Sequence, residues 1–432
     1  MIEHMFDHTA SAEATLDAGQ VEAWVRRLAT SEGPGADDAR VELIASLERL
    51  VCAATGLQAE VTAELDTSVR AREADRGIRA EQRGRGVGAE VALARRESHH
   101  RGRQHVGLAR ILVDEMPCAR RALREGRITE WKATILVRET ACLALEDRQT
   151  VDRRLAGDLD RVEKMGVRQL EGAARKLAAE LDAAACVLRR RVAESERRVT
   201  LRPVPDTMTR LSAELPVAKG VAVFKALSDA ADSARAAGDP RSRHQVMADT
   251  LVDRVLGATD GVVPVEIGLV VSDEVLLGTR EDSAHLDGYG PIPAELAREV
   301  VQSAGERGLA RLRRLYRRPR TGQLVAMDSR SRCFPSGLAK FIRLRDQTCR
   351  TPWCDAPIRH TDHPEPVTSD GETSAANGQG LCEACNYAKE APGWSVRPVD
   401  AEPHTIEIHT PTGAVHRSTS PPLPGHVPKP AA

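Results

Sequence analysis

The sequence has few aromatic side chains, no long hydrophobic run and almost no net charge. Phe, Trp and Tyr make up 3% of its 432 residues, so its cores must be built from Ala, Leu and Val, which suits helices. No uncharged apolar run reaches the length of a membrane span, and the N-terminus lacks the basic and apolar segments of a secretion signal. We therefore expect a folded cytoplasmic protein that does not bind membranes.

The near-zero charge excludes the simplest nucleic-acid binder, a chain that is basic throughout. Lys and Arg total 62, Asp and Glu total 63, and the formal charge is -1. One stretch departs from this balance, because residues 306–350 contain 13 Lys and Arg but only three Asp and Glu. Such a stretch either follows a phosphate backbone or forms a surface hairpin with solvated Arg side chains. Charge alone does not decide between these two interpretations.

At about 150 residues per domain the length predicts two or three domains, and the local pattern divides the chain into five parts. Residues 1–197 show the apolar spacing of helices, and residues 198–305 mix helical with strand-like patterns. Residues 306–348 form a basic hairpin and helix, residues 349–410 a small cysteine-rich module, and residues 411–432 a Pro-rich tail. We expect a mainly α first half, a mixed α/β middle and a largely disordered tail.

The spacing also predicts individual elements. Apolar residues recur at helical intervals over residues 88–116, 129–142 and 167–193, and residues 262–271 form an apolar strand pattern. Arg is frequent on these helices but is mixed with Glu and Asp, which is ordinary for solvated helix faces. The sequence contains no internal repeat, no nucleotide-binding glycine motif and no serine nucleophile elbow. The chemistry is therefore expected in the cysteine-rich module.

Four of the nine cysteines form two close pairs near the C-terminus. Four residues lie between Cys349 and Cys354, two lie between Cys382 and Cys385, and 27 separate the two pairs. Two close thiolate pairs suit tetrahedral zinc, because each pair can turn onto one ion while the intervening segment closes a loop. A redox dithiol also contains Cys-x-x-Cys but does not explain the matched second pair. We predict a structural zinc ion bound by these four cysteines.

A second set of polar residues lies inside this frame at spacings that zinc does not require. Asp362 and His363 are adjacent, Asn377 follows in the loop, and Asn386 and Lys389 come directly after the last cysteine. The segment CRTPWCDAPIRHTDHPEPVTSDGETSAANGQGLCEACNYAKEAPGW resembles the HNH nuclease motif, a ββα-metal fold. DEMPCARRALREGRITEWKA and GLARLRRLYRRPRTGQLVAM resemble bacterial HNH proteins with a long N-terminal helical domain of unknown function, so the resemblance covers most of the chain.

The resemblance implies a metal-dependent endonuclease that hydrolyses DNA phosphodiester bonds. In that interpretation His363 is the general base, Asp362 and Asn386 hold a catalytic divalent ion such as Mg²⁺, and Asn377 braces the loop. Two positions depart from the usual motif. Asn386 occupies a position that is usually His, and Pro364 removes a backbone donor directly after the general base.

DNA is the expected partner, and the predicted phosphate contacts come from basic residues on both sides of the first cysteine pair. An alternative is a non-catalytic, zinc-stabilised nucleic-acid-binding protein whose HNH site has decayed. A third interpretation makes the helical half an oligomerisation or protein-interaction module. The predicted nucleic-acid contacts are Arg313, Arg314, Arg317, Arg318 and Lys389.

Overall fold

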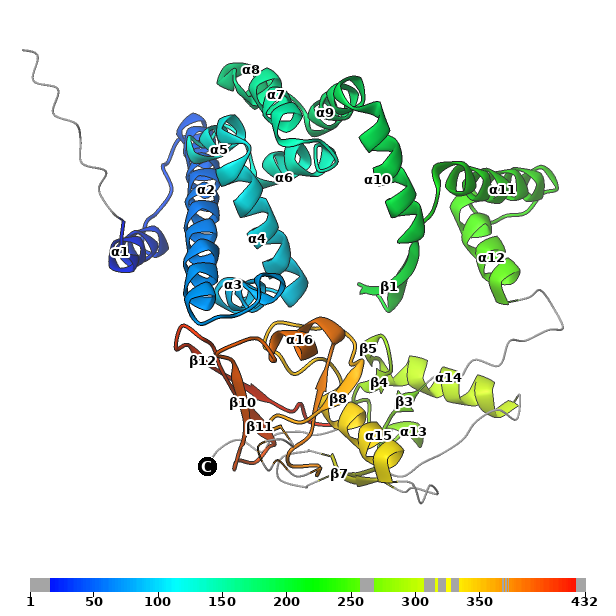
Figure 1. Ribbon diagram of the computed structural model, residues 1–432. Coiled ribbons are helices and arrows are strands. Elements are labelled where there is room, and N and C mark those ends of the chain that lie inside the picture. Colours follow the sequence, from blue (N-terminus) through cyan, green and yellow to red (C-terminus); the bar gives the residue numbers. More distant parts are fainter. Residues whose placement is uncertain are drawn as a thin grey trace, which may run out of the picture.

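A computed structural model of the chain describes residues 16–256, 268–306, 315–317, 324–327, 334–366, 369, 371 and 373–424. This part of the chain is mainly helical and contains five small antiparallel sheets. Figure 1 shows the helices of the first half above the small sheets and helices of the C-terminal region. No helix among the described residues is both long and apolar enough to cross a membrane.

The first half of the chain is built from helices, most of which share one core. Leu112, Met116, Leu123, Leu136 and Leu170 are fully buried there, as expected for a core made of aliphatic side chains. The helices are α1 (Ala18–Ala29), α2 (Asp37–Asp75), η1 (Ala80–Gln82), α3 (Val87–Arg95), α4 (His99–Asp114), α5 (Pro117–Arg124), α6 (Glu130–Glu139), α7 (Leu145–Ala156), α8 (Leu159–Lys164), α9 (Val167–Leu181) and α10 (Ala183–Ser195).

The single helix predicted over residues 88–116 is in fact two helices, α3 and α4. Arg96 ends α3 in the left-handed conformation with φ 55°, and the Ser98 side chain caps α4 by accepting a hydrogen bond from the backbone of Arg101. The two helices then pack closely, since a Cβ atom on Gly102 would lie 2.0 Å from the carbonyl oxygen of Gly88. The prediction was wrong because no glycine or proline marks the break.

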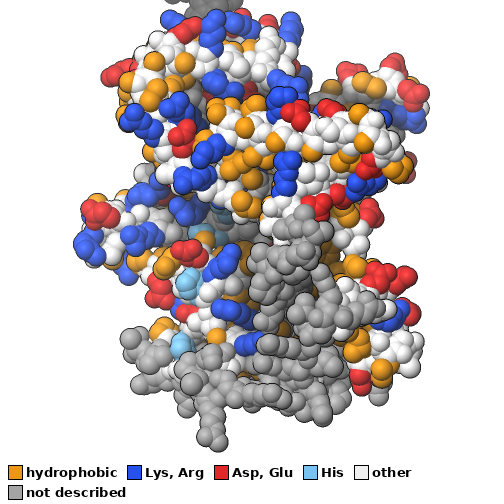
Figure 2. Space-filling view, turned by 90° about the vertical axis from the view of Figure 1, so that its right-hand side faces the viewer, with side chains coloured by type: hydrophobic (Ala, Val, Ile, Leu, Met, Phe, Trp, Pro, Cys, Tyr) orange, Lys and Arg blue, Asp and Glu red, His pale blue; other side chains and the backbone are white. Residues whose placement is uncertain are grey.

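The helix predicted over residues 167–193 is likewise divided, into α9 and α10. Asp182 stands between them, and its side chain accepts a hydrogen bond from the backbone of Ala185 at 2.8 Å. The predicted helix over residues 129–142 is shorter, because α6 ends at Glu139. Figure 2 shows Lys and Arg side chains interspersed with Asp and Glu on the face that it presents. That mixture agrees with solvated, mixed-charge helix faces.

The middle of the chain contains both helices and short strands. The elements are β1 (Arg198–Val204), β2 (Met208–Glu214), α11 (Val217–Ala236), α12 (Arg243–Leu256), β3 (Leu269–Val270), α13 (Asp273–Leu276), β4 (Ala284–Leu286), β5 (Gly290–Ile292) and α14 (Ala294–Glu306). Most of the strand predicted over residues 262–271 lies outside the described residues, and β3 covers its end. Strands β3, β4 and β5 form one sheet, and β1 and β2 form a hairpin.

The C-terminal region carries the cysteine-rich module between two small sheets. Its elements are β6 (Leu315–Arg317), β7 (Leu324–Met327), α15 (Phe334–Asp346), β8 (His360–Asp362), β9 (Gln379–Leu381), α16 (Glu383–Ala388), β10 (Ser395–Val399), β11 (Thr405–His409) and β12 (Val415–Thr419). Strands β8 and β9 pair so that Asp362 lies opposite Gln379. The chain therefore runs strand, strand, helix through the module.

The tail predicted to be disordered is partly a strand. β12 pairs with β11, placing His416 opposite Ile408. Ile406 and Ile408 are buried in β11, so the third strand covers one edge of a strand that carries apolar side chains. The many prolines of residues 411–432 led us to expect disorder. The short stretch Val415–Thr419 nevertheless pairs as a strand. Residues 425–432 lie outside the described residues.

The helical half packs directly against the C-terminal module. The carboxylate of Glu90 in α3 accepts hydrogen bonds from the backbone N–H, at 3.1 Å, and the hydroxyl group of Thr412. A Cβ atom on Gly86 would lie 2.5 Å from Nε1 of Trp394, so only glycine fits against that indole ring. These contacts fix α3 and α4 against the region that contains α16.

Candidate metal centre and adjoining polar site

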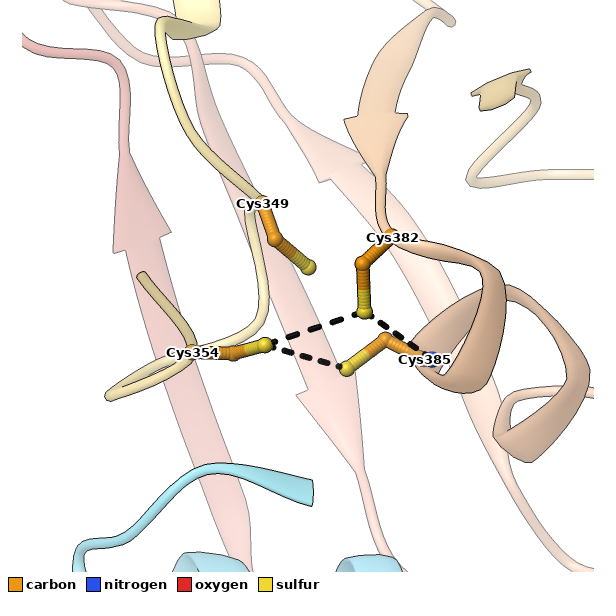
Figure 3. Close-up of side chains that lie close together, drawn as sticks. All are labelled: Cys349, Cys354, Cys382 and Cys385. Atoms are coloured by element: carbon orange, nitrogen blue, oxygen red, sulfur yellow. Dashed lines mark hydrogen bonds between the residues drawn. The ribbon is translucent and has the colours of Figure 1, made fainter. Parts of the chain in front are cut away.

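The four paired cysteines meet at one point in the structure. Cys349 and Cys354 lie on a tight turn after α15, and Cys382 and Cys385 lie at the start of α16 (Figure 3). All four side chains are buried, and the four sulfur atoms lie within 4.8 Å of one another. Cys382 also caps α16, because its Sγ accepts a hydrogen bond from the backbone of Cys385 at 3.4 Å. Local turns in each pair therefore aim the sulfurs at a common centre.

The sulfur spacing fits a tetrahedral zinc site. Zn–S bonds of about 2.3 Å place neighbouring sulfurs of a tetrahedron about 3.8 Å apart. Sγ of Cys354 lies 3.8 Å from Sγ of Cys382 and 3.6 Å from Sγ of Cys385. A disulfide requires about 2.05 Å, so these groups are free thiols. The four cysteines can therefore hold one zinc ion.

Because the four sulfur atoms lie so close together, the pKa values of their thiols shift in opposite directions. Hydrogen bonds from Cys349, Cys354 and Cys385 lower the pKa of the Cys382 thiol, whereas hydrogen bonding with Cys349 and Cys354 raises the pKa of Cys385. Buried thiolates cannot all be charged without a compensating cation. A zinc ion would supply that charge and would hold all four sulfurs deprotonated.

A second polar cluster lies where β8 ends against α16. Oδ2 of Asp362 accepts a hydrogen bond from Nε2 of Gln379 at 3.0 Å and lies 3.1 Å from Nζ of Lys389. Nζ of Lys389 also donates to the backbone carbonyl oxygen of His363 at 3.2 Å. The lysine therefore joins the helix to both residues at the strand end.

His363 follows β8, and among the described residues one of its ring nitrogens has a hydrogen-bond partner. Its Nε2 lies 3.0 Å from Oγ1 of Thr373. With the ring proton on Nε2 and the threonine oxygen as acceptor, Nδ1 keeps the lone pair that can take a proton. Pro364, the residue after it, is buried.

Asn377 closes the loop that begins after His363. Its Oδ1 accepts a hydrogen bond from the backbone N–H of Glu365 at 3.0 Å, and its Nδ2 donates to the carbonyl oxygen of the same residue at 2.9 Å. A Cβ atom on Gly371 would lie 2.0 Å from that carbonyl oxygen, so the loop is tight. The asparagine side chain thus holds the backbone two residues beyond His363.

Asn386 lies on α16 one turn before Lys389 and carries an unpaired oxygen. Its Oδ1 is buried, and no described residue donates a hydrogen bond to it. An unpaired buried acceptor costs about 1–3 kcal/mol. Amide and carboxylate oxygens are the ligands that Mg²⁺ and Ca²⁺ prefer. The Asn386 side chain therefore carries a buried oxygen of the kind that these cations bind.

The basic stretch before the module is only partly available for binding. Arg313, Arg314 and Arg318 lie outside the described residues, and of Arg317 the structure describes only the backbone in β6. Two further arginines of the basic stretch are buried. Arg345 and Arg350 are 2% and 3% exposed, and both pair with Asp346.

Asp346 connects this buried pair of arginines to the polar cluster. Oδ1 of Asp346 lies 2.7 Å from Arg345 and 3.2 Å from Arg350, and Oδ2 accepts a hydrogen bond from the backbone of Gly380 at 2.7 Å. Arg345 also donates to the carbonyl oxygen of Gly378 at 2.6 Å. The network therefore anchors β9 and the loop before it, so these two arginines have a structural role.

Sequence reasoning did not identify Gln379, Thr373 or Asp346. Each acts through a contact with a residue distant in the sequence: Gln379 with Asp362, Thr373 with His363, and Asp346 with Gly380. Of the three, only Gln379 could have been predicted from the sequence. If two short strands pair on either side of the loop, their register shows which residue lies opposite Asp362.

The comparisons with known proteins identify one family. A family model described as "Domain of unknown function (DUF222)" matches residues 37–346, which is most of the chain. The match covers the helical half and the middle and ends just before the first of the paired cysteines. No curated protein and no solved structure matches the chain.

Proposed function

This chain belongs to the DUF222 family, which is often found with HNH proteins, and we propose that its C-terminal module is a metal-dependent HNH-type endonuclease. The substrate class is DNA, and the bond hydrolysed is the phosphodiester. The observation that carries the proposal is the meeting of Asp362 and His363 with Lys389 where β8 ends against α16. The unpaired oxygen of Asn386 lies on the same helix.

The order of the elements supports this assignment. β8, β9 and α16 follow one another as two antiparallel strands and a helix, which is the order of a ββα-metal fold. The first strand ends at Asp362, and the helix carries Asn386 and Lys389. In this proposal the zinc site anchors the start of the helix and replaces the hydrophobic core that so small a module lacks.

His363 acts as the general base. Nδ1 takes a proton from the attacking water, while the hydrogen bond of Nε2 to Thr373 holds the ring in that tautomer. Asn377 keeps the following loop closed, which holds the backbone beyond His363 in place. Lys389 neutralises part of the charge of Asp362 and places a positive group beside the strand end.

Asp362 and Asn386 are the residues that would hold the catalytic divalent ion. Asn386 offers the unpaired Oδ1, and Asp362 offers its second carboxylate oxygen, since Gln379 and Lys389 bind Oδ2. A bound divalent ion stabilises negative charge on the phosphate oxygens during hydrolysis. Asn386 thus supplies an oxygen ligand at the position where the motif usually has His.

One observation favours a second candidate, a zinc-stabilised DNA-binding module without catalysis. Lys389 already neutralises Asp362 through Oδ2, and a carboxylate paired with an ammonium group attracts a divalent ion less strongly. In that case His363 contributes nothing to turnover, whereas the zinc site and DNA binding remain.

Conversion of supercoiled plasmid to nicked circles in Mg²⁺ or Mn²⁺ separates the two candidates. The endonuclease proposal predicts that wild-type protein nicks the plasmid and that His363→Ala abolishes the activity. Equal nicking by both proteins would refute it.

A further inference from the structure

A groove of about 920 Å³ lies between the helical half and the C-terminal module. One wall is formed by η1, the segment after it and one face of α4, and the other by α16 and residues 390–392. Ala384 and Tyr387 of α16 line the groove, whereas Lys389 of the same region reaches Asp362. The groove therefore adjoins the helix that carries the proposed site residues.

Arginines outnumber acidic residues in the lining of the groove. Its acidic lining residues are Glu81 and Glu390. Asp66, behind the wall, pairs with both Arg70, at 3.0 Å, and Arg110, at 2.6 Å, so one carboxylate serves two guanidinium groups. Positive charge therefore exceeds negative charge in the groove. The arginines that line it are Arg70, Arg83, Arg85, Arg103 and Arg110.

Three of these arginines have no acidic partner among the described residues. Nε of Arg83 donates to the carbonyl oxygen of Ile78 at 2.7 Å, and Nε of Arg85 donates to that of Glu81 at 3.2 Å. These bonds orient the side chains without neutralising them. Arg103 is exposed on α4, and its side chain forms neither an ion pair nor a hydrogen bond within the described part of the chain. Their donor groups are thus available to an anion.

A glycine on the same face of α4 leaves room for a ligand to approach the helix. His99, Arg103, Gly107 and Arg110 line the groove at helical spacing. Glycine destabilises a helix interior relative to alanine, yet a Cβ atom on Gly107 would have no neighbour within 4 Å. Packing within the chain therefore does not require glycine there. Glycine allows a ligand to approach the helix backbone closely.

We propose that this groove binds the sugar–phosphate backbone of duplex DNA. The assignment rests on the proposed function, which makes DNA the ligand. Arg83, Arg85 and Arg103 contact phosphates, and Gly107 lets the DNA backbone approach α4. Tyr387, 63% exposed on the opposite wall, provides an aromatic surface at the edge of the groove. The helical half thus contributes directly to DNA binding, which gives a part of the chain of unknown function a specific role.

The test measures binding of a 30-base-pair DNA duplex to the full-length chain in the absence of Mg²⁺, by fluorescence anisotropy over a series of salt concentrations. The groove variant is Arg83→Gln/Arg85→Gln/Arg103→Gln. We expect its affinity at about 0.1 M salt to fall at least tenfold and the slope of log K against log salt to decrease by about 2 to 3, since each phosphate contact contributes about 0.9.

The control carries the same charge change on another surface, Arg153→Gln/Arg154→Gln/Arg161→Gln, where all three arginines are exposed on α7 and α8. It should keep the wild-type slope. Gly107→Ala changes no charge and should lower the affinity for DNA several-fold. Its salt slope should differ from that of wild type by no more than about 0.9, the contribution of one phosphate contact. Groove and control variants with the same slope, or Gly107→Ala with wild-type affinity, would overturn the assignment.

The outcome is separable from that of the nicking assay. If wild type nicks plasmid through His363 but the groove variant keeps the wild-type salt slope, only the proposal for the groove is refuted. If the groove variant has a smaller salt slope but wild type never nicks plasmid, the proposal for the groove stands and the proposed hydrolysis is refuted.

Discussion

Nζ of Lys389 lies 3.1 Å from Oδ2 of Asp362, and this ion pair joins α16 to the end of β8. The two side chains are 10% and 18% exposed, so the pair is largely shielded from water. Cys382 and Cys385 anchor the start of the same helix at the cysteine cluster. A metal ion bound at the four cysteines would therefore also help to fix the helix that carries Asn386.

The first prediction concerns zinc. Replacing all four paired cysteines by serine should remove about one equivalent of zinc per chain, measured by elemental analysis of the purified protein. The module should become sensitive to proteolysis, because zinc binding supplies much of the folding free energy of small zinc modules. Cys142→Ser is the control, since Cys142 is a half-buried thiol outside the cluster.

The control variant should keep both its zinc and its resistance to protease. Zinc content that does not change in the four-serine variant would rule out the four-thiolate site, whatever its effect on folding.

A second prediction compares one substitution at two positions of α4. Gly102→Ala should destabilise the protein by several kcal/mol, because its Cβ atom would lie 2.0 Å from the carbonyl oxygen of Gly88. Gly107→Ala should stabilise it by about 0.5–1 kcal/mol, because open space surrounds that position and alanine favours helix. Urea denaturation measures both. Equal effects would contradict the close packing of α3 on α4.

A third prediction concerns the buried pair of arginines. Asp346→Asn should destabilise the protein by about 3–5 kcal/mol, because Arg345 and Arg350 would keep buried charges without a carboxylate. Asp249→Asn is the matched control, since it removes an exposed partner of Arg241 and should cost under about 1 kcal/mol. Similar thermal shifts for the two variants would show that the Asp346 network contributes little.

A fourth prediction concerns pH. Burial, with Arg345 and Arg350 nearby, lowers the pKa of His404 to about 4 from 6.5. Between these values the unfolded chain binds a proton that the folded chain does not, so this contribution to stability is complete above about pH 6.5 and is lost as pH falls towards 4. The loss between pH 7 and pH 5 should be about 2 kcal/mol.

His404→Gln isolates that contribution. The difference in unfolding free energy between wild type and variant should shrink by about 2 kcal/mol from pH 7 to pH 5, because glutamine does not titrate. A difference that stays constant with pH would show that His404 is protonated normally in the folded state.

The cysteine site was predictable because its information is local. Cys349 with Cys354, and Cys382 with Cys385, each turn within a few residues, and the structure brings the two pairs together. The polar cluster was predictable only as a set of residues. Its contacts with Gln379 and Thr373 depend on strand pairing and loop closure, which composition and spacing do not specify.

Other features could not be read from residue type. Arg345 and Arg350 belong to the basic stretch that suggested phosphate binding, but they are buried against Asp346. The basic groove lies elsewhere, on arginines of α2, of α4 and of the segment after η1, and nothing in the sequence separates them from ordinary solvated residues. The break at Arg96 had no glycine to mark it. In each case tertiary packing, which the local sequence does not encode, decided the outcome.

The central claim is that His363 serves as the general base of a DNA hydrolase. Its most direct test is the single-turnover rate at which wild type and His363→Ala nick supercoiled plasmid in Mg²⁺, with zinc content measured to be equal in both proteins. The account predicts that wild type is at least about 100-fold faster, the effect of removing a general base. Equal rates at equal zinc content would contradict it.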